Sequence, residues 1–404
     1  KAGLGVTPSR IRLVRPVLRA SYRNGEFSLG SLDPLVERFT GRPPRPDARG
    51  PLVLVEQGRV RLDTEYGPVA VLGDARIDDG KLMRLSARMP AADLKSGEVE
   101  ARALAASVAL TTTGDRVRLQ ASATAAAATL PGFSGADARL TVAGDLPYPD
   151  LKQRRGDGRA RLDLDLVAAR LTAGDLVARQ AVADLTFDGQ TAGWLESFRI
   201  EGAADGDLRA ARLRTPGLDA SAPAVRWSRA RAAIARDGEG LDWRLDGPVR
   251  VTAARALGVG VDAAGVAVTS SALTIGGRNA ALEVSGPVAL PADRLGWGDL
   301  SLAAARGSGD LELVSDAGLR LHLDGGLRAS QGAWPLFGPA GRDDGPDLAA
   351  MKQALSRFAL DIPAFSLVAG DGGTRLALSR PATLRPATGG VLTGSPPAAP
   401  FFSA

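Results

Sequence analysis

The chain has 404 residues, enough for two or three ordinary domains or for one repeat structure, and a formal net charge of +5. Apolar residues at 45% and charged residues at 24% exclude a chain that is disordered as a whole. The absence of cysteine excludes disulfides, thiol nucleophiles and thiolate metal sites. Basic and acidic residues are interspersed and aromatics are only 4%, so we expect no nucleic-acid partner.

Residues 1–51 are predicted to form an N-terminal hairpin, a short helix and a Pro-rich linker. Asn24-Gly25 is typical of a hairpin turn, and Pro34 suits the first turn of a helix near 32–39. Five arginines lie between Arg10 and Arg23. They fit either a solvated strand face or a surface close to anionic lipid headgroups.

Residues 52–380 are predicted to form one long β-meander. Its clearest strand alternates Leu162, Leu164 and Leu166 with charged residues, so one face is apolar and the other is charged. Similar short strands recur from Leu52 to Leu323. The turns expected between them include Gln57-Gly58, Tyr66-Gly67-Pro68, Asp79-Gly80 and Ala173-Gly174-Asp175.

Three segments depart from this pattern. The alanine-rich stretch 121–129 is compatible with either a strand or a helix. Apolar residues three and four apart predict a helix over 348–360, opened by Pro346 and ended by Asp361-Ile362-Pro363. The segment 381–404 is rich in proline and glycine.

Catalytic motifs are missing from the sequence. His322 is the only histidine and falls on the polar side of its strand, where a catalytic base or a metal ligand would lack partners. Asp163 and Asp165 share a solvated face with Arg161 and form no isolated carboxylate pair. There is neither a Gly-rich phosphate loop nor a Gly-x-Ser-x-Gly elbow. We therefore expect no enzyme, no cofactor and no metal site.

Two stretches carry a family resemblance. One runs from Ala20-Ser21-Tyr22-Arg23-Asn24-Gly25 through Gly30-Ser31-Leu32-Asp33-Pro34, and the other is Gly332-Ala333-Trp334-Pro335-Leu336-Phe337-Gly338-Pro339. Together with the Arg/Asp/Leu alternation and the Asp-Gly turns, they resemble the YdbH-like branch of the AsmA-like proteins. These are envelope relatives of TamB, some described as dicarboxylate-transport domain proteins. The chain would match the N-terminal part of a longer member.

The resemblance implies a fold and a function. The fold would be mostly all-β, an elongated, curled antiparallel sheet that forms an apolar groove, with short helices near 32–39 and 348–360. The function would be phospholipid transfer between inner and outer membranes in the periplasm. The acyl chains would be the cargo, and an outer-membrane partner is unknown. An inner-membrane anchor or partner would lie outside this chain.

The apolar alternates are the candidate groove lining. We expect this role for Val53, Val55, Leu62, Leu162, Leu164, Leu166, Leu311, Leu313, Leu321 and Leu323. The alternative is a structural or adhesive β-solenoid, in which the same face closes on itself as an ordinary core and carries no lipid. The residues alone leave both interpretations open.

Overall fold

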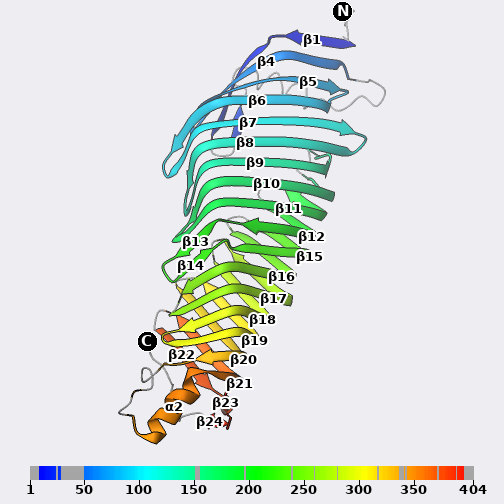
Figure 1. Cartoon of the computed structure of the whole chain (residues 1–404). Coiled ribbons are helices and arrows are strands. Elements are labelled where there is room, and N and C mark those ends of the chain that lie inside the picture. The colour runs from blue at the N-terminus through cyan, green and yellow to red at the C-terminus, as the bar shows by residue number, and fades with distance from the viewer. Residues whose placement is uncertain are drawn as a thin grey trace, which may run out of the picture. The chain divides into compact units, whose positions relative to one another are not determined.

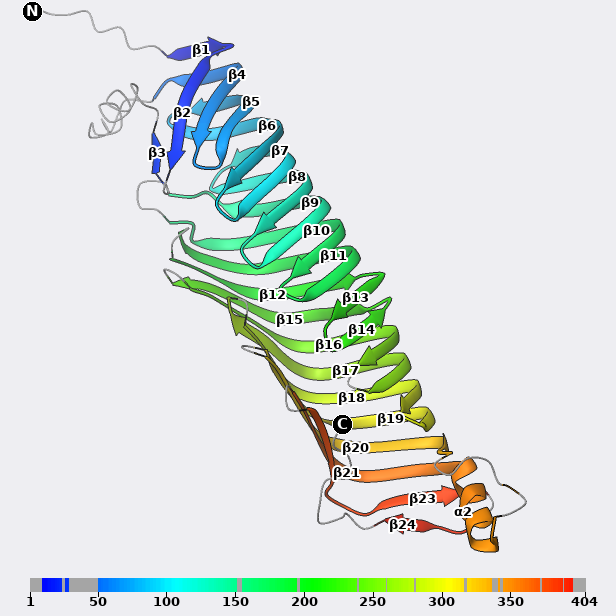
Figure 2. The same cartoon turned by 90° about the vertical axis from the view of Figure 1, so that its left-hand side faces the viewer.

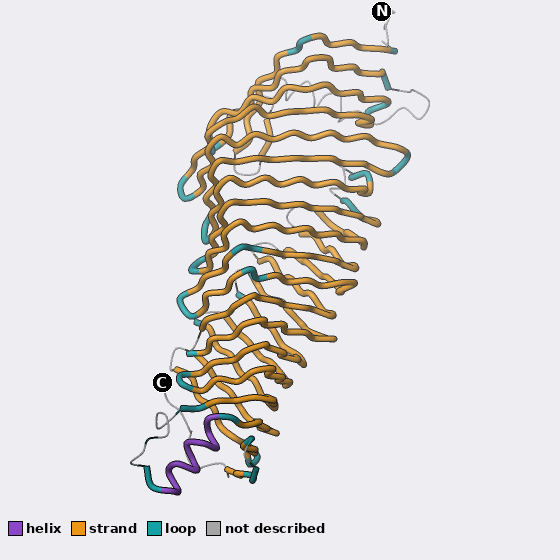
Figure 3. Tube along the Cα trace, in the orientation of Figure 1, coloured by secondary structure: helices purple, strands orange, loops and turns teal. Residues whose placement is uncertain are grey.

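The computed structural model describes residues 9–23, 26–28, 50–150, 155–194, 197–237, 240–258, 260–279, 281–315, 318–335, 341, 344–370, 373–387 and 389–394. Strands dominate these residues, and a single helix lies near the C-terminal end of the described part (Figures 1 and 3). The prediction of a mostly all-β, antiparallel fold is confirmed. The predicted helix at 32–39 and the Asn24-Gly25 turn lie outside the described residues.

The chain forms two compact units. Unit 1 contains residues 1–174 and 181–186, and unit 2 contains residues 175–180 and 187–404. The division therefore falls inside the strand β11 (Leu176–Trp194), within the segment predicted as one meander at 52–380.

Unit 1 is built from long antiparallel strands, each paired with the next in sequence. These strands are β4 (Leu52–Thr64), β5 (Gly67–Asp78), β6 (Lys81–Ser96), β7 (Val99–Thr113), β8 (Arg116–Leu130), β9 (Phe133–Pro147) and β10 (Gly158–Ala173). The ambiguous stretch 121–129 is thus strand. The predicted turn at Asp79-Gly80 is confirmed. The turn predicted at Tyr66-Gly67-Pro68 lies slightly earlier, at Glu65-Tyr66, because Gly67 begins β5.

The first strands pair with β4 in parallel. They are β1 (Arg10–Val14) and β2 (Val17–Arg23), while β3 (Glu26–Ser28) pairs with β2 in antiparallel. Arg15, with φ of 52°, and Pro16 interrupt the edge between β1 and β2. The chain nevertheless stays attached there, because the Arg15 N–H donates to the Glu56 carbonyl and the Arg59 N–H donates to that of Pro16.

The strands are longer than the sequence predicts, and the expected turn at Gln57-Gly58 is wrong. Gln57 instead is an extra residue inside β4, with φ of 51°, where the register with β5 shifts between Val55 and Gly58. Its N–H donates to Asp74 Oδ1 at 2.8 Å. A β-bulge of this kind bends its strand, and several long strands of unit 1 bend along their length in Figures 1 and 2.

Unit 2 repeats this antiparallel design. Its strands are β12 (Ser197–Arg209), β13 (Arg212–Thr215), β14 (Leu218–Ser221), β15 (Ala224–Asp237), β16 (Gly240–Gly258), β17 (Val261–Arg278), β18 (Leu282–Trp297), β19 (Leu300–Ser315), β20 (Leu319–Ala333), β21 (Phe358–Gly370), β22 (Gly373–Leu378), β23 (Ala382–Pro386) and β24 (Leu392–Gly394). The β13–β14 hairpin is an insertion, because β12 pairs directly with β15.

The helix α2 covers Pro346–Ser356, so the prediction of a helix to residue 360 is wrong at its C-terminal end. Phe358 begins β21, in which Phe358, Leu360 and Ile362 pair with β20 and follow the period of a strand. A nearly buried ion pair, Lys352 Nζ to Asp344 Oδ1 at 2.9 Å, ties α2 to the residues before it. The Gly341 N–H and then Lys352 hold the pKa of Asp344 below its usual value.

Candidate functional site

The apolar residues of unit 1 form rows across its strands. Leu164 and Leu166 pair with Val142 and Leu140 of β9, which in turn pair with Ala121 and Ala123 of β8. Leu162 continues a parallel row through Gly144 to Leu119. The side chains of Leu162, Leu164 and Leu166 are half-buried, whereas the alternating residues between them are exposed. One face of the unit 1 sheet is therefore apolar from strand to strand.

The bulge in β4 keeps the first strand on the same face. Val55 pairs with Ala75, and Leu62 pairs with Val69, two residues of β5 that share a face. Without the extra residue Gln57, the Leu62 side chain would point to the opposite face, because a register shift of one residue moves every following side chain to the other face of the sheet. Val53 and Val55 thus lie on the same face as Leu62. All six lining residues predicted in unit 1 share the apolar face.

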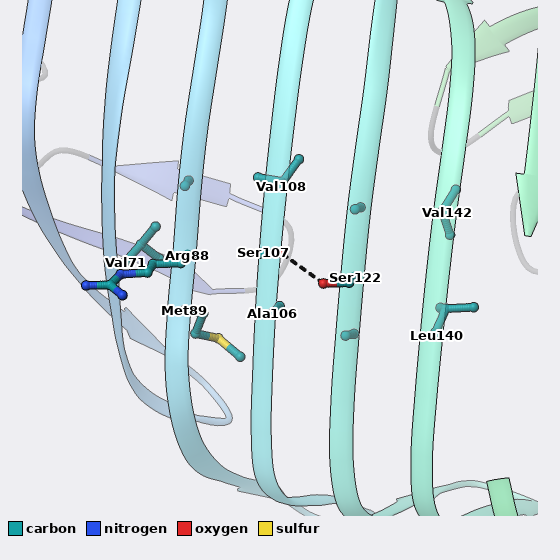
Figure 4. Close-up of a pocket in the computed structure, with 12 residues that line it drawn as sticks. Val71, Arg88, Met89, Ala106, Ser107, Val108, Ser122, Leu140 and Val142 are labelled. Carbon is teal, nitrogen blue, oxygen red and sulfur yellow. Dashed lines mark hydrogen bonds between the residues drawn. The ribbon is translucent and has the colours of Figure 1, made fainter. Parts of the chain in front are cut away.

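This face holds a hollow of about 330 Å³. Figure 4 shows Met89, Ala106, Val108, Leu140 and Val142 around it, on strands β6 to β9. The volume lies at the lower end of the range typical of ligand pockets, roughly 300–1,000 Å³. The remaining side chains that share this face of the hollow are Val71, Ala87, Ala121 and Ala123.

These hollow residues are not among the predicted lining residues. The alternation is clearest at leucine and valine, whereas several hollow positions hold alanine. The signal was present in the alanine-rich stretch 121–129, where small residues occupy every position of the apolar face. The Ser107 and Ser122 hydroxyls are hydrogen bonded at 2.8 Å across β7 and β8. Their positions alternate with those of Ala106 and Ala121, so the serines belong to the other face of the sheet.

In unit 2 the predicted lining residues are packed together. Leu311 pairs with Leu323, and Leu313 pairs with Leu321. Leu323 is only 8% exposed and belongs to a cluster of buried residues with Val249, Leu273 and Val288. The structure thus brings Leu311, Leu321 and Leu323 into one apolar cluster, with less open space than on the face of unit 1.

Aromatic rings fill much of this face where the backbone leaves room. A Cβ atom on Gly206 would come within 2.1 Å of the Trp227 ring, and one on Gly332 within 2.4 Å of Phe358. Each glycine therefore provides the space that a ring occupies. Phe358 is 3% exposed and lies in a second cluster with Leu302, Ala305 and Ala329.

The charged face of unit 2 is crossed by ion pairs. Arg255 donates two hydrogen bonds to Asp262, at 2.8 and 2.7 Å, and Arg244 pairs with Asp246 at 2.7 Å. Hydrogen bonds from Arg212 lower the pKa of Asp219 to about 2, with a smaller contribution from Arg214. These pairs are exposed, so each stabilises the fold only slightly.

His322 lies beside a serine and an aspartate. Its Nε2 atom is 3.1 Å from Ser366 Oγ and 3.1 Å from Asp324 Oδ1. A serine triad needs the two partners on different ring nitrogens, so that one orients the base and the other gives up its proton. Both partners share Nε2 here, so the cluster lacks the geometry of a triad.

Two further features concern metals and membranes. Within the described ranges, no group of histidine, aspartate and glutamate side chains is arranged to hold a metal ion. No helix in the described part of the chain is long and apolar enough to cross a membrane.

Comparison with known proteins finds no matching family model, no similar curated protein and no similar solved structure. The resemblance to the AsmA-like proteins therefore stays a prediction.

Proposed function

We propose that the chain carries phospholipid acyl chains on the apolar face of its sheet, as a segment of a lipid-transfer bridge. The observation that carries this proposal is the row structure of unit 1. Apolar residues meet across β4 to β10, a hollow opens among them, and no described helix covers that face. Its leucines remain only half-buried, as do its valines except for the buried Val69 and Val117.

The energetics of the cargo fit such a face. Each methylene removed from a bilayer into water costs about 0.8 kcal/mol, so a sixteen-carbon chain needs shelter worth on the order of 10 kcal/mol. Rows of Leu, Val and Ala supply apolar contact at every strand, so a chain can move between neighbouring strands without leaving that contact. No reacting group is required. Given the resemblance described above, we extend the proposal to transfer between inner and outer membranes in the periplasm.

The second candidate is a structural or adhesive β-solenoid with a sealed core. The buried clusters of unit 2 favour it, because Leu323, Val288 and Phe358 already pack as core residues do. Such a protein would carry no lipid in either unit.

Native mass spectrometry of the purified chain, combined with lipid extraction, separates the two candidates. We expect near-stoichiometric phospholipid on the wild-type protein and on Thr141→Arg, which adds a charge to the polar face. Leu164→Arg adds the same charge to the apolar face and is expected to retain less than about one tenth of the lipid, because a charge is costly to bury beside an acyl chain.

Two outcomes would contradict lipid transfer. One is a lipid-free wild-type protein that is fully folded. The other is global unfolding of Leu164→Arg while Thr141→Arg stays folded, since that pattern marks Leu164 as part of a sealed core.

A further inference from the structure

The polar face of unit 1 carries a group of arginines that form no ion pair with any described residue. Cross-strand arginine pairs also occur in unit 2, Arg226 with Arg250 and Arg306 with Arg328. In these pairs, however, Arg226 and Arg328 each form an ion pair with an aspartate.

Arg76 and Arg84 are direct cross-strand partners on β5 and β6, and both are exposed. Like charges in this position destabilise a sheet. Arg84 also pairs with Thr111, whose partner on β8 is Arg118. Three arginines therefore follow one row across four strands.

Two more arginines flank this row. Arg59 and Arg88 both pair with Leu72, from β4 on one side and from β6 on the other. We call Arg59, Arg76, Arg84, Arg88 and Arg118 the arginine patch. Among the described residues, no carboxylate forms an ion pair with any of these five side chains. In unit 2, by contrast, Arg244, Arg255 and Arg328 each have an aspartate within 3.2 Å.

Two residues of the patch border a second hollow, of about 910 Å³, on the same strands. Arg59 and Arg88 line it together with hydroxyl groups from Ser86, Ser107, Ser122 and Thr141. Asp74 also lines it, but its Oδ1 atom accepts a hydrogen bond from the Gln57 N–H. The hollow thus combines two arginines and four hydroxyl groups with one carboxylate, Asp74. Elsewhere in the patch, Arg118 has Asp145 of β9 as its cross-strand partner, so the five arginines outnumber the neighbouring carboxylates.

Arg76 and Arg84 lie on adjacent strands, whereas the patch as a whole extends from Arg59 on β4 to Arg118 on β8, which is roughly 19 Å at a strand spacing of about 4.8 Å. The patch is therefore much wider than one small anion. No aromatic residue lines this hollow, although stacking aromatics are typical of a single-stranded nucleic-acid surface. An array of guanidinium groups on a hydroxyl-bearing surface fits the phosphates of many neighbouring lipid headgroups.

We propose that the arginine patch of unit 1 docks the chain on an anionic phospholipid surface, through the face opposite to its apolar rows. The interaction is electrostatic, so it weakens as salt is raised. The neutral hydroxyls add hydrogen bonds to phosphate oxygens. Docking through the polar face leaves the apolar face free. The docking proposal therefore holds whether or not the apolar face carries lipid.

Vesicle co-sedimentation of the full chain tests this docking. The probe is vesicles of equimolar phosphatidylglycerol and phosphatidylcholine, with vesicles of phosphatidylcholine alone for comparison. We expect the wild-type protein to bind the anionic vesicles, to release them at high salt and to leave the neutral vesicles unbound. The triple variant Arg76→Gln, Arg84→Gln, Arg88→Gln is expected to bind roughly 100-fold more weakly, because each arginine near such a surface contributes a factor of about five and the three factors multiply.

A charge-matched control distinguishes the patch from net charge. Arg244→Gln, Arg255→Gln, Arg328→Gln also removes three positive charges, but from ion pairs of unit 2. We expect it to bind within about twofold of wild type, since its arginines are already neutralised by aspartates. The proposal would be overturned if both triple variants lost the same amount of affinity for anionic vesicles. It would also be overturned if the patch variant bound these vesicles as tightly as the wild-type protein.

Three more measurements complete the test. Far-UV circular dichroism is expected to show that both triple variants are folded. The patch variant removes a like-charge pair, and the unit 2 variant removes only exposed ion pairs, which stabilise the fold slightly. If the protein bound inorganic phosphate or single-stranded DNA more tightly than the anionic vesicles, the proposal of a membrane partner would be wrong. Lipid extraction from the patch variant is expected to recover as much phospholipid as from wild type. A wild-type chain that carries no lipid but docks through the patch would refute lipid transfer alone.

Discussion

Units 1 and 2 use the same strand alternation with side chains of different size. In unit 1 the buried apolar residues are alanines and two valines, Val69 and Val117, among the described residues. In unit 2 they include Leu273, Leu302 and Phe358. Alternation decides which face of a sheet is apolar, whereas side-chain volume decides whether that face keeps open space or packs shut.

Aromatic residues allow the two units to be observed separately. All five tryptophans lie in unit 2, and all three tyrosines lie in unit 1, at Tyr22, Tyr66 and Tyr148. Tryptophan fluorescence therefore reports the unfolding of unit 2. Tyrosine absorbance reports that of unit 1.

The largest effect is expected from Phe358→Ala. Phe358 is 3% exposed in a packed cluster, so its removal leaves a cavity and costs about 3–5 kcal/mol. Urea unfolding followed by tryptophan fluorescence measures the loss. Met351→Ala, on the exposed side of α2, is the control and is expected to change stability little. Equal effects would mean that Phe358 is not a core residue.

A leucine truncation in each unit compares the two faces directly. Leu323→Ala in unit 2 is expected to cost about 2–4 kcal/mol, because the neighbouring residues surround the side chain. Leu164→Ala in unit 1 is expected to cost about 1 kcal/mol, since that side chain is only half-buried. Urea unfolding followed by both optical signals gives the two values. A similar cost in both units would remove the distinction between them.

Enlarging an alanine probes the remaining space. Ala305→Leu in unit 2 is expected to cost about 1–3 kcal/mol, since Ala305 is 2% exposed and its cluster has no room. Ala123→Leu adds the same atoms to the hollow of unit 1 and is expected to change stability by less than about 0.5 kcal/mol. It is also expected to lower the amount of retained phospholipid, as measured by lipid extraction. Destabilisation by Ala123→Leu as large as by Ala305→Leu would show that unit 1 is sealed too.

The smallest effect concerns acid. The Arg212 hydrogen bonds lower the pKa of Asp219 in the folded state from 3.8 to about 2. The ionised carboxylate therefore stabilises unit 2 above pH 3.8, and this contribution disappears as the pH falls through about 2. Thermal unfolding midpoints measured across this range are expected to fall more for wild type than for Asp219→Asn. Parallel curves would contradict the assignment.

The alternation in the sequence predicts the face of each lining residue well. Leu164 and Leu311 both lie on the apolar faces of their strands, because a period of two depends on local geometry alone. Alternation does not distinguish the half-buried Leu164 from the buried Leu323. That difference arises from residues distant in sequence, such as Ala123 beside β9 and Phe365 beside β20.

Glycines were the main source of error in the turn predictions. Gln57-Gly58 looks like a turn, yet it lies inside a long strand at a shift of register. Ala173-Gly174-Asp175 and Asp79-Gly80 are turns as predicted. A bulge and a turn both need residues with unusual backbone angles, so local sequence alone does not separate them. The helix was predicted too long because Phe358 fits either period until its partner Gly332 is known.

Pairing between consecutive strands has a consequence for the growth of this molecule over evolutionary time. From β5 to β9, each strand of the described chain pairs only with the strands just before and just after it. Removing β6 and β7 together would leave β5 and β8 with opposite directions, ready to pair as antiparallel neighbours. The sheet can therefore lose or gain one hairpin at a time while every other pairing persists. Duplication or deletion of a hairpin can therefore change the length of the sheet without changing the fold.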